Sequence, residues 1–75
     1  MEAESIELIA APRSKVVGKK LKDLKLPREC VIGAISRPSG EVIVPRGEDS
    51  IQAGDRVIFF ALDRVVGALE SMFIG

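Results

Sequence analysis

The residues that usually perform catalysis or bind metals are sparse in this 75-residue chain. It has no histidine and one cysteine, Cys30, and its serines are scattered over expected turns and the chain ends. A catalytic nucleophile needs a neighbouring base, and imidazole is the commonest metal ligand in proteins. Neither arrangement is present in this pattern, so we expect no catalytic residue, no metal site and no enzymatic activity.

Positive charge is concentrated in one segment, which is the main candidate for binding an anion. Residues 13–28 carry seven basic side chains and one acidic side chain, a net charge of +6, whereas the whole chain has a formal net charge of 0. The basic residues are Arg13, Lys15, Lys19, Lys20, Lys22, Lys25 and Arg28. Such a run could form an anion site or touch a membrane surface, but lysines around a two-turn helix are ordinary, which favours a solvated face that keeps an apolar domain in solution.

Three other kinds of site are disfavoured. Cys30 opens an apolar stretch, which favours a small buried hydrophobe over a redox switch. Glu48, Asp49 and Asp55 occupy a polar stretch, but their spacing does not match an EF-hand loop. A nucleic-acid polymer is not expected, because the chain has neither Trp nor Tyr and no overall positive charge.

Hydrophobic periodicity predicts two elements before residue 30. Ile6, Leu8 and Ala10 recur at every second position, which indicates a first strand. Residues 19–25 place Leu21 and Leu24 three apart, as on one face of a short helix surrounded by lysines. The residue before a proline avoids the helical conformation, so Pro27 closes this helix.

The rest of the chain predicts three strands and a final helix. We expect strands over residues 30–36, 41–44 and 56–62, with a tight turn at 37–40 between the first two. Gly33 inside a strand indicates close approach of another group. Ile51 is the single large apolar residue of a polar loop that Gly54 turns back, so we expect its side chain to fold onto the core.

These elements predict a single α+β domain over residues 1–75. The expected order is β-α-β-β-β-α, with a mainly antiparallel sheet flanked by two helices. The last helix repeats apolar residues at helical spacing and is wider than the stripe that one sheet covers. We therefore expect a homodimer with its interface on Val66, Leu69, Met72 and Phe73. No apolar run is long enough to span a membrane, and one unpaired cysteine suits the cytoplasm.

The order of several short motifs resembles the C-terminal domain of the TrkA/RCK family of potassium uptake regulators. The likeness covers nearly the whole chain and includes SKVVGK, LKDL, VIGAI, PRG and GDRVI, with the final helix after them. Each motif alone is weak, whereas their order and spacing are specific. The resemblance implies a regulatory domain of a Trk-type potassium uptake system that works by dimerising and coupling to membrane transporter subunits.

The resemblance also implies partners that this stretch does not supply. Members of the family carry a Rossmann-like, TrkA-N domain or subunit that binds NAD(H) or adenine nucleotides, and no G-x-G-x-x-G turn occurs here. We expect no cofactor in this domain and a cytoplasmic location, peripheral to the inner membrane through the transporter. The alternative is a stand-alone or antiporter-associated sensor of a small ligand such as cyclic di-AMP.

We expect the effector of either assembly to be a small anion bound where two copies of the domain meet. Some family members bind cyclic di-AMP in that position, although Pro27 and Cys30 stand near where those sites have Arg and Asn. The expected apolar contacts are Val17 and Ile32 with their symmetry mates. Lys15, Lys19 and Arg28 would lie at the rim and attract the anion through screened charge.

Overall fold

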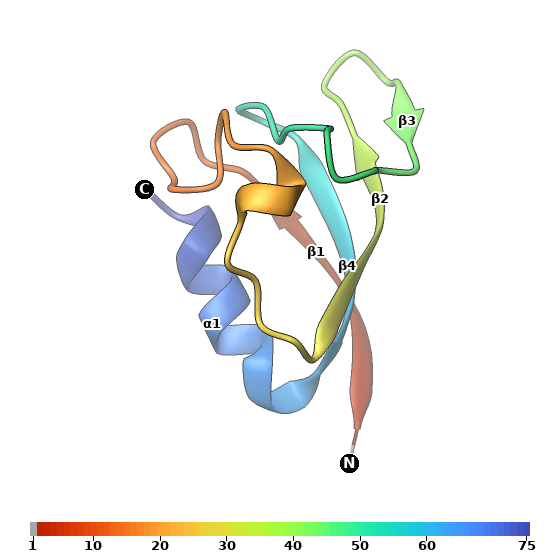
Figure 1. The fold of residues 1–75 in the computed structure, drawn as a ribbon, viewed down its shortest axis with the longest axis vertical. Coiled ribbons are helices and arrows are strands. Elements are labelled where there is room, and N and C mark those ends of the chain that lie inside the picture. The colour runs from red at the N-terminus through yellow and green to blue at the C-terminus, as the bar shows by residue number, and fades with distance from the viewer. Residues whose placement is uncertain (1) are drawn as a thin grey trace.

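Four strands form one antiparallel sheet in a computed structural model that describes residues 2–75; Met1 of the expected domain lies outside it. The strand order is β1-β4-β2-β3, and one helix packs beside the sheet (Figure 1). The elements are β1 (Ala3–Ile9), the one-turn 3-10 helix η1 (Leu21–Asp23), β2 (Cys30–Ser36), β3 (Val42–Ile43), β4 (Arg56–Leu62) and α1 (Asp63–Phe73). The predicted α+β class and antiparallel sheet are confirmed.

One face of the sheet is buried against α1. Alternate residues of β4 (Val57, Phe59 and Ala61) are buried, as the period of a strand requires. The ring of Phe59 meets that of Phe73 from α1 edge to face, with centroids 5.6 Å apart and planes at 87°. Such contacts stabilise a core beyond the area that they bury. Strand β4 lies inside the sheet, between β1 and β2.

The opposite face of the sheet has no helix over it in the described part of the chain. Val31 and Phe60 are directly opposed on β2 and β4 and remain 62% and 53% exposed. Gly33 lies at a shift in the register and under the Phe60 ring, where a Cβ atom would lie 2.8 Å from that ring. The predicted close approach at Gly33 is confirmed, whereas the apolar residues of β2 are buried on one face only.

The helix expected over residues 19–25 is reduced to η1, so a single α-helix flanks the sheet. Lys20 and Leu24 on either side of η1 are extended, with ψ angles of 147° and 137°. The amides of Leu21 and Lys22 donate to the carbonyls of Asp49 and Gly47, at 2.9 and 3.0 Å. These loop bonds use amides that the first turn of a helix leaves unpaired, and the extended backbone at Leu24 ends the helix after one turn.

Two residues that we expected at a dimer interface belong to the core of the protomer. Leu69 and Phe73 are 0% and 2% exposed, because they project from α1 onto the sheet. Neither side chain is accessible to a partner, which corrects the interface drawn from the sequence. Val66 and Met72 are half-buried, and their role at an interface remains a prediction.

The loop between β3 and β4 is anchored by Ile51, as predicted. Its side chain is fully buried. Its backbone bridges Val17, and the Gly18 amide donates to the Ile51 carbonyl at 2.8 Å. Ile51 thus connects the loop to the core and to the lysine-bearing segment before η1.

A buried ion pair closes the same loop. The carboxylate of Asp55 is 0% exposed, and its Oδ2 atom accepts from the Gln52 amide at 2.7 Å and from Nη1 of Arg37. Arg37 Nη1 also donates to the Ser50 carbonyl at 3.1 Å. Asp55 therefore bonds its own turn, as an aspartate beside glycine is expected to do, and the Arg37 contact is additional.

We predict that an Ile51→Ala variant unfolds at a markedly lower temperature. Truncating a buried isoleucine removes apolar contact and leaves a cavity, at a cost of about 2–5 kcal/mol. Val44→Ala is the matched control, because Val44 is 81% exposed. Thermal melts followed by circular dichroism test this, and an Ile51→Ala transition as high as that of Val44→Ala would contradict the anchoring role.

Candidate functional site

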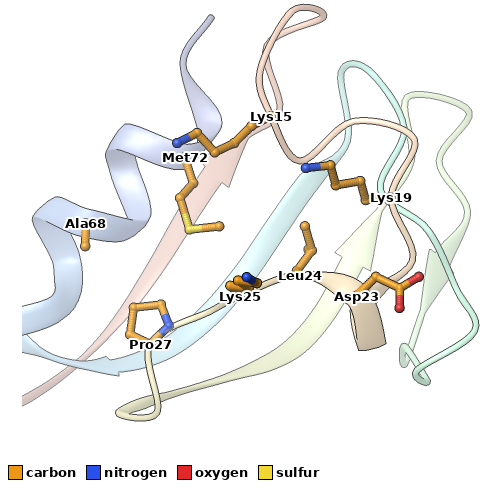
Figure 2. A pocket seen from close by; sticks show the side chains of 8 residues that line it. All are labelled: Lys15, Lys19, Asp23, Leu24, Lys25, Pro27, Ala68 and Met72. Carbon is orange, nitrogen blue, oxygen red and sulfur yellow. The ribbon is translucent and has the colours of Figure 1, made fainter.

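A hollow of about 420 Å³ lies between α1 and the segment that precedes β2. Lys15 and Lys19 come from the stretch after β1, and four further residues come from η1 and the stretch that follows it (Figure 2). Helix α1 contributes Ala68 and Met72. We call this site the lysine hollow; its lining residues are Lys15, Lys19, Asp23, Leu24, Lys25, Pro27, Ala68 and Met72.

The lysine hollow combines an apolar wall with a basic rim. Figure 2 shows the side chains of Lys15 and Lys19 extending over Met72 and Leu24. Three lysines and one aspartate line the hollow, so it has a net formal charge of +2. An apolar wall with a few convergent polar groups is the usual composition of a small-molecule site. Its charge favours an anion.

Two other lysines of the basic segment are paired elsewhere. Lys20 and Lys22 place their Nζ atoms 2.9 and 2.6 Å from the carboxylate oxygens of Glu48. Hydrogen bonds from Lys22 and then from Lys20 lower the pKa of the Glu48 carboxyl. The basic segment therefore divides into lysines that face a hollow and lysines that tie η1 to the loop before β4.

The structure brings together only part of the predicted ligand set. Lys15 and Lys19 line the lysine hollow, as the rim of a site requires. Arg28 lines a shallower depression of about 230 Å³ beside Val31 and Phe60. Val17 and Ile32 pack against the core of their own protomer.

Lys25 and Met72 line the hollow but were not assigned to a ligand from the sequence. Lys25 was one of seven basic residues with nothing to distinguish it. Met72 recurs at helical spacing with Leu69 and was therefore grouped with the expected interface. The segment before β2 and the last turn of α1 meet only in the folded chain, so sequence spacing could not relate these two residues.

Cys30 is held in its strand as a poorly ionised thiol. Its Sγ lies 3.3 Å from the Pro27 carbonyl, to which it donates. Burial, followed by the nearby Glu29 carboxylate, raises the pKa of the Cys30 thiol. A thiol with a raised pKa is a weak nucleophile at neutral pH. Among residues 2–75, no group of three or more His, Cys, Asp or Glu side chains is placed to bind a metal ion.

The helices of the described residues do not include one that is long and apolar enough to cross a membrane.

We predict that Cys30 reacts slowly with iodoacetamide at neutral pH. The reaction needs the thiolate, and a raised pKa leaves less thiolate at a given pH. A Val31→Cys, Cys30→Ala variant is the matched comparison, because position 31 is 62% exposed. Mass spectrometry over time measures both rates. If Cys30 reacts as fast as the cysteine at position 31, the assignment as an inert, half-buried thiol is wrong.

Comparisons with known proteins agree on one family. The TrkA-C domain family model matches residues 6–74. The Trk system potassium uptake protein TrkA homolog 2 from Methanosarcina mazei is 43% identical to this chain over 72 residues. The Trk system potassium uptake protein TrkA from Azorhizobium caulinodans is 39% identical over 70 residues. These alignments cover 96% and 93% of this chain but only 16% and 15% of the relatives.

A solved structure supports the same fold. The structure of an RCK domain with cda superposes on this chain with a TM-score of 0.81 and 23% sequence identity. The superposition covers 92% of this chain and 96% of the RCK domain chain. The chain spans about a sixth of the length of the TrkA relatives, so the similarity concerns one domain of them. The match over nearly all of its residues shows that this chain belongs to the TrkA-C domain family.

Proposed function

We propose that this chain is a regulatory domain of a Trk-type potassium uptake system and that it binds a small anionic effector in the lysine hollow. The observation that carries the proposal is the convergence of Lys15, Lys19 and Lys25 on an apolar hollow, in a chain of the TrkA-C family. Its activity is binding, because the described side chains offer charge and apolar surface. The domain acts in the cytoplasm, at the membrane through its partners.

The shape and charge of the lysine hollow define the class of effector. At about 420 Å³ it lies within the size range of small-molecule sites. Lysine is a point charge that suits phosphate oxygens, and Leu24, Pro27 and Met72 suit a planar or apolar group. The effector is therefore a phosphate-bearing molecule with an apolar or aromatic body.

The proposed partners follow from the names of the relatives, which are Trk system potassium uptake proteins. The domain works with a TrkA-N-like domain or subunit, which takes NAD(H) or an adenine nucleotide, and with a membrane potassium transporter subunit. The assembly is a homodimer. An effector can shift its state only by binding two arrangements with different affinity. The difference lies between protomers, because the core of one protomer is well packed, so the effector in the lysine hollow also contacts the second protomer.

The second candidate is a stand-alone or antiporter-associated sensor of a ligand such as cyclic di-AMP. It is favoured by the fact that the lysine hollow lies within one protomer and needs no nucleotide-binding domain to complete its described wall. Both candidates place the effector in the same hollow. They differ in whether the domain must be attached to a transporter to have its effect.

We predict that a Lys15→Gln, Lys19→Gln variant binds anionic nucleotides at least about tenfold more weakly, since tenfold corresponds to about 1.4 kcal/mol and two charge-assisted contacts contribute that much. Isothermal titration calorimetry with cyclic di-AMP, ATP and inorganic pyrophosphate gives the affinities. The matched control is Lys20→Gln, Lys22→Gln, which removes the same charge from the lysines that pair with Glu48.

The outcomes separate the two candidates and can reject both. Tight binding of cyclic di-AMP alone favours the sensor, whereas binding of ATP or pyrophosphate with similar strength favours a general anionic effector. Failure of all three probes to bind, or an equal loss in the control variant, would overturn the lysine hollow as the site.

A further inference from the structure

Charge is unevenly distributed over this molecule, although its formal net charge is 0. Residues 13–25 contain six basic side chains, all of them exposed, and one acidic side chain. Arg46 is also exposed and lies in the loop whose Gly47 and Asp49 carbonyls accept from the amides of η1. We call the seven basic residues the basic pole: Arg13, Lys15, Lys19, Lys20, Lys22, Lys25 and Arg46.

Acidic side chains neutralise only part of the charge of the basic pole. Three carboxylates lie in the same two segments, at positions 23, 48 and 49, so seven positive charges leave a net formal charge of +4. Glu48 forms ion pairs with two of the lysines. Within residues 2–75, no ion pair joins Arg13, Lys15 or Lys19 to a carboxylate. The charge of these three residues is therefore directed at whatever surrounds the protein.

The opposite end of the molecule is acidic. Glu2 and Glu4 lie at the N-terminal end of β1, and the Asp63 amide at the start of α1 donates to the Glu2 carbonyl at 3.1 Å. A hydrogen bond with the Asp63 carboxylate, followed by the negative charge of that group, raises the pKa of the Glu4 carboxyl. Figure 1 shows the N-terminus and the start of α1 at the bottom, whereas residues 13–22, in orange, lie towards the top.

The two ends are far enough apart to act separately. The molecule is 35 Å long along its longest axis, which is vertical in Figure 1. Charges on a protein surface are screened over about 8 Å at physiological ionic strength. A charged surface that meets one end is therefore almost insensitive to the other end. A formal net charge of 0 does not prevent strong local attraction.

An exposed apolar side chain beside the basic pole suits a lipid surface. Ile74 is 71% exposed. It follows Phe73, whose carbonyl accepts from the Ala11 amide at 3.0 Å, so the end of α1 lies beside the segment that carries Arg13. Apolar side chains combined with basic ones are typical of contacts with the membrane interface. Single-stranded nucleic acid binds to aromatic side chains that stack on its bases, and the two segments of the basic pole contain none.

We infer that the basic pole docks this domain directly on the anionic surface of the membrane that contains its transporter. The inference rests on the proposed function for the presence of that membrane, since the relatives are Trk system potassium uptake proteins. Lysine and arginine side chains near an anionic leaflet are attracted to it within about one screening length. The acidic end then points away from the lipid, so the docking fixes the orientation of the domain.

The docking surface and the lysine hollow share Lys15, Lys19 and Lys25. An anionic effector in the hollow adds negative charge among these lysines, which weakens their attraction to anionic lipid. Linkage requires the converse, so the membrane weakens effector binding by the same factor. The effector thereby releases the domain from the membrane surface without any change in the core of the protomer.

Co-sedimentation with lipid vesicles tests the docking without an effector. We expect strong binding to vesicles of phosphatidylcholine and phosphatidylglycerol in equal parts, much weaker binding to pure phosphatidylcholine, and loss of binding as salt is raised. Lys15→Gln, Lys19→Gln should weaken binding about 30-fold, which corresponds to about 2 kcal/mol for two charges. The matched control is Arg28→Gln, Arg64→Gln, which removes the same charge near the acidic end and should weaken binding little.

Two results of this assay would overturn the docking. An equal loss in the two double variants would mean that the vesicles attract the net charge and not the basic pole. Equal binding to the two kinds of vesicle would mean that anionic lipid is not the partner, and an acidic protein surface would take its place.

A release experiment tests the link between docking and effector. ATP is added to the vesicle-bound chain, and sodium chloride of the same ionic strength is the control. We expect ATP to release more protein than the salt does. If ATP binds in calorimetry but releases no more protein than the salt, the shared-lysine mechanism is overturned and the effector site stands. If vesicles bind but no nucleotide does, the proposed effector fails and the docking stands.

Discussion

The contact on which the rest of this structure depends is the buried ion pair between Arg37 and Asp55. It joins the turn after β2 to the turn before β4, and Asp55 also accepts from the Gln52 amide. An unpaired buried carboxylate is strongly destabilising. The loop that contains Ser50 and Ile51 is therefore kept against the sheet, with the Ser50 carbonyl bonded to Arg37.

The lysine hollow depends on that loop. The segment after β1 has no regular structure of its own, and it borrows backbone partners from the loop before β4. The Gly18 amide donates to the Ile51 carbonyl at 2.8 Å, and the Leu21 amide donates to the Asp49 carbonyl at 2.9 Å. These bonds determine where Lys15 and Lys19 leave the backbone. The ion pair thus positions the rim of a site with which it has no direct contact, and the same segment lies against Met72 of α1.

Local patterns in the sequence were enough to predict the sheet, but they could not predict the long-range polar contacts. Alternation identified the strands, a lone apolar residue identified Ile51 as an anchor, and a glycine within a strand identified close approach at Gly33. The helix over residues 19–25 was overestimated, because the backbone is extended at Lys20 and Leu24 and only one turn forms between them. Helical spacing placed Leu69 and Phe73 on the apolar face of the last helix, but it could not show whether that face packs on the core of one protomer or on a second protomer.

The most direct test of this account is amide hydrogen exchange in an Arg37→Lys variant, with Arg46→Lys as the matched control. Both bonds come from the Nη1 atom of Arg37, and the shorter side chain of lysine keeps the charge without placing a donor at the position of that atom. We expect the Gln52, Gly18 and Leu21 amides to lose protection together in the Arg37 variant and to keep it in the control. If the Gln52 amide loses protection while those of Gly18 and Leu21 keep theirs, the ion pair does not organise the lysine hollow.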